Sequence, residues 1–590
     1  MTDGTKNPLW KTTLESYTGK GHIYDLTDNL DINWYILEGL QFKGQFSVTK
    51  NDSKTESFTD PDDPSYQYTP IKEKGQLSRS LSTGYNWNVN AMFYYNRAFG
   101  MHFINATMGL NIKESKNESY SMLFKGFQLG SMNTPAFAAT QPDKTDVSRT
   151  QDRLFAFLAS VNYSLNNIYL LDASVRFDGS SQFGSDKRFA PFWSVGLGVN
   201  FHNYKWLKDH WLVSTLRARG SYGSTGKVNF QPYTAVTTYE TDADSWYYTG
   251  PATKLVYLGN TDLTWEKTNT LDVGIALGLF SDRYYIEANY YHKKTNDLID
   301  QVTIRSSSGF DQYYTNSGSV VNKGFEVKVS ATVYQDEKWV VTLTGNMAGN
   351  KNKITSLGKS TEEYNKKLNE EYDSSWPSYG REFMATPFTQ YYVGASTSAI
   401  YAVRSAGIDP ANGKEKFIKK NGTSSYTWCA DDQVVVGDES PTANGTFGVN
   451  VNYRGFYVNA YFSYQWGAQS YNETLRSKVE NANIKDNNVD KRVLTERWKK
   501  PGDISAYIDL TNNTTTKPTS RLVQDDDYLT FSSLSVGYDF KKELLQKIRL
   551  TSLGVRFNAN DICRWSTIKE ERGTSYPYAK NYSFTISVGF

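Results

Sequence analysis

Residues that could do chemistry are scattered through this 590-residue sequence, and no familiar catalytic combination is complete. The stretch Gly220 to Lys227 (GSYGSTGK) superficially resembles a phosphate-binding loop. Its glycine spacing is wrong, however, and Val228 follows the lysine where Ser or Thr is required. No serine sits in a nucleophile elbow, and the five histidines form no cluster. The sequence therefore predicts no catalytic residues and no cofactor or metal site, and we expect a protein that is not an enzyme.

Acidic clusters and cysteines leave two minor alternatives open. Carboxylates gather at Asp60 to Asp63, at Asp242 and Asp244, and at Asp525 to Asp527. Calcium prefers several oxygen ligands from flexible loops, but none of these stretches matches a defined calcium loop, so solvated loop charge is the simpler interpretation. Cys429 and Cys563 lie far apart without metal-type spacing, and either one disulfide or two free thiols is compatible with the sequence.

Aromatic side chains in polar stretches are the best candidates for ligand contact. Trp246, Tyr247 and Tyr248 are consecutive, and Trp428 lies in the longest polar stretch. Flat rings stack on sugars or pack against peptides, so we predict ligand contact at these four residues. The alternative is that the rings pack the loops together or cover a partner protein.

The elements that position these residues are strands with one oily and one polar face. In the closing stretch Lys580 to Phe590, the residues Tyr582, Phe584 and Phe590 alternate with small polar residues. Charged residues make up 21%, aromatic residues 15%, and the mean hydropathy is −0.59. No apolar run approaches the roughly 18 to 20 residues that a membrane helix needs. The net charge of +2 gives no global field that would suggest nucleic acid.

Similar strands recur in pairs, with short turns and long polar loops in strict alternation. This sorting of loop lengths is typical of an outer-membrane β-barrel with short periplasmic turns and long extracellular loops, whereas a soluble sandwich gives no reason for it. We predict an all-β, antiparallel transmembrane β-barrel with long loops near 52–82, 116–149, 223–266, 298–317, 354–444, 469–526 and 562–579. Its strands are expected at about 23–37, 39–51, 83–96, 101–115, 150–164, 168–178, 190–202, 212–222, 267–280, 283–297, 318–334, 337–353, 445–453, 456–468, 527–540, 547–561 and 580–590.

The polar faces of these strands should line the lumen. Asp172, Arg176 and Asp178 alternate with apolar residues, so we expect them to face inward, where they would line a substrate path or contact a plug. The predicted strands number about seventeen, an odd count, whereas single-chain bacterial barrels have even counts. The N-terminal stretch shows no basic and apolar segments of a signal peptide. We therefore expect a C-terminal fragment whose first and last strands are free edges.

Several stretches resemble the SusC/RagA family of TonB-dependent transporters. They include Asn7 to Trp10, Leu171 to Ser181 running on to Phe192 to Gly196, Leu216 to Gly226, Leu263 to Thr268 with Gly278 to Phe280, Ala406 to Pro410 with Asn412 and Gly413, Tyr528 to Tyr538, and Tyr576 to Phe590. The resemblance covers nearly the whole chain, and the motif around Asp178 to Ser181 is its most specific part. Phe590 resembles the terminal signal that the barrel-assembly machinery recognises.

The resemblance implies that residues 1–590 are the C-terminal part of a barrel of about 22 strands. The plug domain, TonB box and signal peptide of the family are absent from the sequence. The implied function is import of a glycan or oligosaccharide, or of a peptide, across the outer membrane. The implied partners are a SusD-like surface lipoprotein, TonB–ExbB–ExbD acting through the plug, the barrel-assembly machinery, and membrane lipids including lipopolysaccharide.

Three alternatives remain for the function. The chain could be a passive porin or structural barrel, a non-functional truncated remnant, or a soluble all-β carbohydrate-binding protein.

Overall fold

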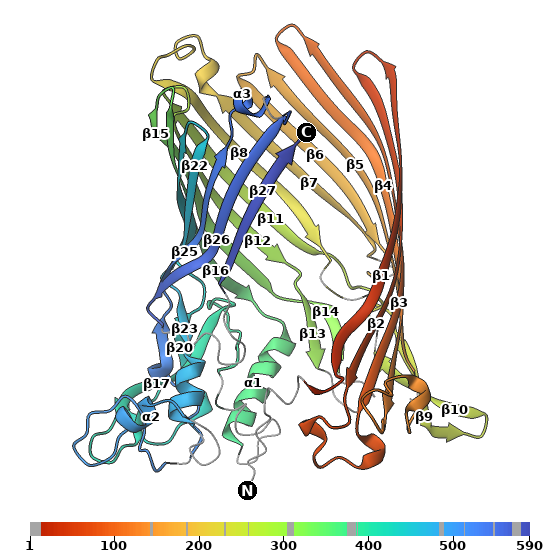
Figure 1. Ribbon diagram of the computed structural model, residues 1–590, viewed down its shortest axis with the longest axis vertical. Helices are drawn as coiled ribbons and strands as arrows, with labels where there is room; N and C mark the ends of the chain where they lie inside the picture. Colours follow the sequence, from red (N-terminus) through yellow and green to blue (C-terminus); the bar gives the residue numbers. More distant parts are fainter. Residues whose placement is uncertain are drawn as a thin grey trace.

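One antiparallel sheet of 17 strands forms the wall of a barrel (Figure 1). The computed structural model describes residues 13–141, 145–184, 187–228, 230, 232–257, 259–303, 312–374, 385, 387–482, 489–512, 514–546, 549–568 and 580–590. The wall strands are β1 (Tyr17–Leu37), β2 (Leu40–Thr59), β3 (Gln76–Phe99), β4 (His102–Lys125), β5 (Asp146–Leu165), β6 (Tyr169–Ser180), β7 (Phe189–Asn200), β8 (Val213–Lys227), β11 (Glu266–Leu279), β12 (Tyr284–Asn296), β15 (Ser319–Gln335), β16 (Trp339–Ser356), β21 (Ala443–Tyr453), β22 (Phe456–Trp466), β25 (Tyr528–Asp539), β26 (Ser552–Ser566) and β27 (Asn581–Gly589).

Each wall strand pairs with the next wall strand along the chain, in an up-and-down order from β1 to β27. The predicted fold class and strand count are confirmed. Short turns join the strands at one end, where the chain also finishes, and long insertions gather at the other end (Figure 1). Asn166 and Asn167, with φ 55° each, form one of these short turns in the left-handed region that Asn tolerates.

The wall is not closed. Among the described residues, β1 pairs only with β2, and β27 pairs only with β26. Because every step between neighbouring strands is antiparallel, the first and the last of 17 strands run in the same direction. They therefore cannot complete an antiparallel barrel with each other, and the prediction that they are free edges is confirmed. Figure 1 shows β1 and β27 standing apart on the near side.

The two faces of the sheet differ as the alternation predicts. Outward side chains are apolar and exposed, as at Val175, Phe177 and Val195, because lipid and not protein covers them. Tyr582 and Phe584 of β27, and Phe590 directly after this strand, are exposed as well. Trp34, Trp193 and Trp466 are also exposed on the outer face, as expected of aromatic residues at the membrane interfaces.

The first strands extend further than the alternation indicated. β2 continues to Thr59 and β4 to Lys125, so the loops expected at 52–82 and 116–149 are shorter than predicted. The reason is that these strands rise above the lipid, where the outer face is polar too. There, cross-strand ion pairs replace apolar contacts: Arg79 Nε lies 2.6 Å from Glu56 Oε1, and Arg153 Nε lies 3.0 Å from Glu114 Oε1.

The long insertions build an extracellular loop layer with its own small core. Its elements are β9 (Thr238–Tyr247), β10 (Gly250–Tyr257), β13 (Ile299–Thr303), β14 (Gln312–Asn316), α1 (Lys359–Asp373), β17 (Ala399–Ile408), β18 (Glu415–Ile418), β19 (Ser424–Ser425), β20 (Gln433–Asp438), β23 (Gln469–Tyr471), α2 (Arg492–Thr495) and β24 (Val523–Asp525), while α3 (Lys542–Leu545) lies at the short-turn end. Ile400, Leu475, Val479 and Leu522 form the main apolar cluster of this layer.

Two smaller observations complete the fold. No helix in the described parts of the chain is long and apolar enough to cross a membrane. Cys429 and Cys563 are both free thiols, so of the two alternatives open from the sequence, the structure contains the unpaired one.

Candidate functional site

The inner wall of the barrel carries a charged hollow. Asp172 of β6, Arg217 and Arg219 of β8, and Asp272 of β11 line a depression of about 350 Å³. Gly196 and Gly198 also line it, and their missing side chains leave the space open. Two carboxylates and two guanidinium groups thus face the lumen from neighbouring strands, as the register of these strands requires.

Arg219 of this hollow is held in place by residues of the same face. Arg219 Nη2 donates to Glu287 Oε1 at 3.1 Å and to Asn289 Oδ1 at 2.9 Å, both on β12. Charge-assisted hydrogen bonds of this kind fix the direction of a guanidinium group. The hollow therefore presents oriented charges to any polar molecule or segment in the lumen.

The other two lumen-facing candidates pair with each other. Arg176 Nε lies 2.6 Å from Asp178 Oδ1, and the Asp178 side chain is almost covered. Asp172, Arg176 and Asp178 thus share one face of β6, but only Asp172 belongs to the hollow. Whether they contact a substrate or a plug stays a prediction.

The predicted aromatic contacts separate into two environments. Trp246, Tyr247 and Tyr248 lie at the tip of the β9–β10 hairpin, with exposed fractions of 71%, 66% and 103%. This hairpin projects outward from the loop end of the barrel (Figure 1). Three adjacent exposed rings thus lie at the tip of a projecting hairpin, and ligand contact there stays a prediction.

Trp428 lies inside the loop layer. Its indole N–H donates to the Pro518 carbonyl at 2.9 Å, and its ring centroid lies 5.6 Å from that of Tyr372. Lys517 Nζ stands 4.8 Å from the ring centroid, and burial lowers the pKa of this lysine. The placement matches the packing alternative raised from the sequence, and ligand contact at Trp428 stays a prediction.

A second hollow adjoins α1, of about 1010 Å³. Half of its lining residues are acidic or aromatic, namely Glu362, Glu370, Asp373, Tyr391, Tyr392 and Asp431. The helix itself was not predicted. Asn365, Leu368 and Tyr372 are its buried residues, and their i, i+3, i+7 spacing is the signal that could have revealed it.

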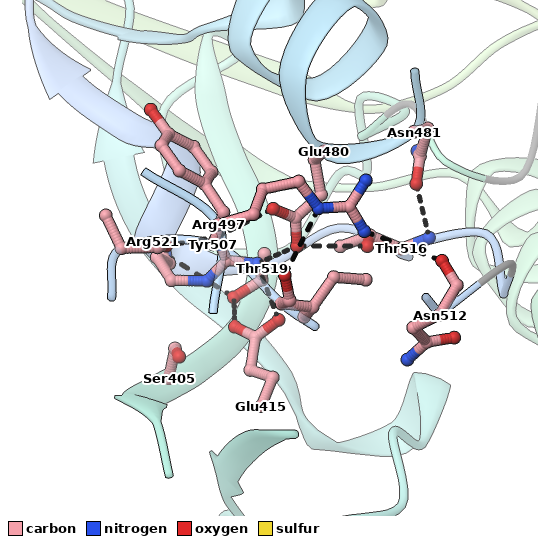
Figure 2. Close-up of polar contacts among 12 residues, drawn as sticks. Ser405, Glu415, Glu480, Asn481, Arg497, Tyr507, Asn512, Thr516, Thr519 and Arg521 are labelled. Carbon is pink, nitrogen blue, oxygen red and sulfur yellow. Dashed lines mark hydrogen bonds and ion pairs between the residues drawn. The ribbon is translucent and has the colours of Figure 1, made fainter. Parts of the chain in front are cut away.

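A buried ionic cluster joins the segments of the loop layer (Figure 2). Arg521 Nη2 lies 3.0 Å from Glu415 Oε2 and 2.5 Å from Glu480 Oε1. The Glu480 side chain has no exposed area, and that of Glu415 has 4%. Burial opposes the charge on Arg521, but the two carboxylates outweigh it and raise the pKa of its guanidinium group.

Hydroxyl groups complete the cluster. Thr519 donates to Glu415, and Thr516 donates to Glu480 Oε1 at 3.2 Å. Sequence reasoning missed this cluster because Glu415 and Glu480 lie 106 and 41 positions from Arg521, and no local pattern connects them.

Of the acidic stretches considered for calcium, Asp60 to Asp63 serve local structure, whereas the side chains of Asp242 and Asp244 lie outside the described part of the structure. Asp60 Oδ1 accepts from the Asp62 amide at 2.9 Å, and Asp63 Oδ1 accepts from the Ser65 amide at 2.8 Å. Within the described residues, no group of three or more His, Cys, Asp or Glu side chains is arranged to hold a metal ion.

The wall has an oily outer face and a polar inner face, with short turns at one end and a loop layer at the other. These features define a β-barrel of the outer membrane. More specifically, the chain belongs to the family described as TonB dependent receptor-like, beta-barrel, whose model matches residues 2–560. The resemblance to SusC/RagA-like transporters noted in the sequence is thereby confirmed at the level of the family.

Individual relatives agree with this assignment. TonB-dependent receptor P39 of Formosa agariphila is 25% identical over 591 residues, which cover 92% of this chain and 54% of that protein. TonB-dependent receptor SusC of Bacteroides thetaiotaomicron is 26% identical over 380 residues, which cover 60% of this chain and 37% of that protein. The chain thus spans about half the length of the first of these relatives.

Among solved structures, the fold matches that of the RagAB peptide transporter with a TM-score of 0.81 at 23% identity. The match covers 97% of this chain and 62% of that one.

Proposed function

We propose that this chain is the barrel part of a TonB-dependent importer of the outer membrane that takes up an oligosaccharide or a peptide. The observation that carries the proposal is the charged hollow of Asp172, Arg217, Arg219 and Asp272 on a lumen wall whose outer face is oily. Such a wall gives a polar molecule a route past lipid, and family membership supplies the TonB-dependent class. Import of this kind makes and breaks no bond.

The proposed domain assignment is that residues 1–590 form the C-terminal part of such a barrel. The parallel direction of β1 and β27 supports it, because an odd number of additional antiparallel strands is needed to close the wall. A plug and a TonB box would belong to the remainder of the transporter. TonB with ExbB and ExbD would then act on the plug, and the lumen charges would contact the plug at rest and the substrate in transit.

The closing strand supports a role in assembly. Tyr582, Phe584 and Phe590 form a continuous apolar face on a strand with one free edge. A free strand edge recruits another strand through its backbone groups. We propose that this strand is the segment that the barrel-assembly machinery binds.

The proposed extracellular partner is a SusD-like lipoprotein that covers the loop layer. Two neighbours support it in different ways: SusC is a relative of the chain, and the fold resembles the RagAB transporter. The tip of the β9–β10 hairpin is a suitable contact because tyrosine and tryptophan are enriched at the centres of protein interfaces. In this proposal the tip rings bind the lipoprotein, and ligand contact by the same rings is the alternative.

Replacing Trp246 and Tyr247 by Ala is expected to weaken capture of the lipoprotein about tenfold or more, since buried aromatic anchors dominate interface energies. The measurement is affinity capture of the lipoprotein by the membrane-embedded protein. Trp211→Ala is the matched control, because Trp211 is equally exposed but precedes β8 at the opposite end of the barrel. If the double variant and the control capture equal amounts of the lipoprotein, the hairpin is not part of the interface.

A passive porin is the second candidate, and energy dependence separates the two. If the chain works in a TonB-dependent importer, a protonophore is expected to stop uptake of radiolabelled oligosaccharide or peptide in cells carrying it. The control is a culture without the gene, whose uptake of the same radiolabelled compound gives the background value. Uptake that continues undiminished with protonophore would favour the passive barrel.

A further inference from the structure

The outer wall of β11, β12, β15 and β16 carries a cluster of basic side chains directly beyond its oily band. Lys294 of β12, Lys323 of β15, and Lys351 and Lys353 of β16 are all exposed, and we call these four residues the lysine patch. They occupy outward positions, because their cross-strand rows contain outward residues of the neighbouring strands. Lys323 pairs with His292 on one side and with Lys351 on the other.

The height of the patch follows from the register. One row closer to the short turns, Tyr290 pairs with Phe325, and both rings are exposed on the outer face. Val329, Ile286 and Ile275 continue this oily face toward the short turns. The lysines therefore begin where the lipid-facing surface ends on the extracellular side, at the level of the lipid headgroups.

No acidic residue faces outward in the described rows that contain the patch. The outward positions of its rows, from Lys267 and Asn269 through Asn296 and Val321 to Lys353, include no Asp or Glu. Across the described residues, no ion pair joins any of the four lysines to a carboxylate. Lys323 and Lys351 lie directly opposite each other, an arrangement that destabilises a sheet unless an anion lies between them.

On the other side of the barrel, the charged residues of the outer wall form ion pairs with one another. On β2 to β5, outward cations beyond the oily band have outward carboxylates beside them. Lys50 Nζ lies 2.8 Å from Asp52 Oδ2, and Arg149 Nε lies 2.6 Å from Glu118 Oε1. Arg153 likewise pairs with Glu114. The described cations of these pairs are thus balanced by protein carboxylates, whereas none of the four lysines of the patch is paired with a carboxylate among the described residues.

We propose that the lysine patch binds the phosphate groups of outer-leaflet glycolipids. Phosphates of the headgroup layer are the anions that reach this height on the outside of the wall, and lysine clusters beside a membrane attract anionic headgroups. Lysine side chains lay their methylene groups along apolar surface while their ammonium groups reach the polar layer. The oily band below the patch provides such an apolar surface for the four lysines. The inference rests on the barrel being in the outer membrane and is independent of the transported substrate.

The test is native mass spectrometry of the full chain in detergent, titrated with diphosphorylated lipid A. A variant combining Lys294→Gln, Lys323→Gln, Lys351→Gln and Lys353→Gln is compared with a variant combining Lys50→Gln, Lys54→Gln, Arg149→Gln and Arg153→Gln. Both remove four cations from the outer wall, and heat-modifiable migration verifies that each variant folds. A third variant with Arg at all four patch positions keeps the charge.

The expected result is that the patch variant loses lipid A binding by about fivefold per lysine removed, while the variant on β2 to β5 changes little and the Arg variant binds like the parent. Dephosphorylated lipid A should bind the parent as weakly as the patch variant binds lipid A. Three results would overturn the proposal: equal binding by the patch variant and the parent, equal losses in both quadruple variants, or undiminished binding of dephosphorylated lipid A. Displacement of lipid A by equimolar inorganic phosphate would also overturn it, by showing a soluble-anion site.

Discussion

Arg521→Met is expected to open the extracellular loop layer while leaving the barrel wall intact. The substitution removes the cation that pairs with two buried carboxylates, Glu415 and Glu480. Removing one partner of a buried ionic cluster costs about 3–5 kcal/mol, because the remaining charge is uncompensated. Hydrogen exchange followed by mass spectrometry is the measurement, and amides of β18 and β24 should exchange about a hundredfold faster.

The control for this experiment is Arg153→Met. Arg153 also pairs with a carboxylate, but its side chain is 66% exposed, and exposed pairs contribute about 0–1 kcal/mol. A triple variant with Arg521→Met, Glu415→Gln and Glu480→Gln should recover part of the protection, because it leaves no buried charge. If Arg521→Met exchanges no faster than the parent, the cluster does not hold the loop layer together.

Val175→Arg is expected to impair insertion of the barrel into a bilayer. Val175 lies near the middle of β6 on the outer face, where an arginine at the membrane midplane costs about 2–4 kcal/mol. The measurement is the folded fraction in lipid vesicles as a function of urea concentration, read from heat-modifiable migration.

Ser174→Arg tests the same wall from the other side. Ser174 adjoins Val175 but faces the lumen, where its hydroxyl lies 2.7 Å from that of Ser194. Because the lumen is wet, the arginine should cost far less there than at Val175. Similar losses from both substitutions would mean that β6 does not separate lipid from lumen.

The barrel wall could be predicted from the sequence because lipid and water impose opposite demands on neighbouring residues. Tyr169, Leu171 and Val175 alternate with Asp172 and Ser174, and a period of two is readable in one strand at a time. The prediction of strand ends was wrong where this contrast vanishes. On β2, Lys50 to Glu56 have polar residues on both faces, so the pattern gives no sign that the strand continues.

The structure of the loop layer could not be predicted from the sequence, for a different reason. Its stability depends on contacts between distant segments, such as Arg521 with Glu415 and Trp428 with Pro518. No window of sequence contains both partners. Trp246 was recognised as a candidate contact, but its place at the tip of a hairpin follows only from the pairing of β9 with β10.

The lysine patch could not be predicted from the sequence for a third reason. Lys294, Lys323 and Lys351 look like ordinary strand lysines when each is considered alone. Their significance depends on the register that places Lys323 beside Lys351 and on the absence of acidic residues from the same outward rows. A charge pattern across strands becomes visible only after the strands are aligned.

The open seam has a consequence for self-association. Two copies inserted with the same topology are related by a rotation about the membrane normal and a shift in the membrane plane, which preserve whether each strand runs up or down across the membrane. Any edge of one copy, β1 or β27, is therefore parallel to any edge of the other. Identical neighbours could therefore not complete the wall by the antiparallel pairing used throughout it. Antiparallel closure requires a segment with an odd number of strands between β27 and β1, and such a segment would pair with both edges at once.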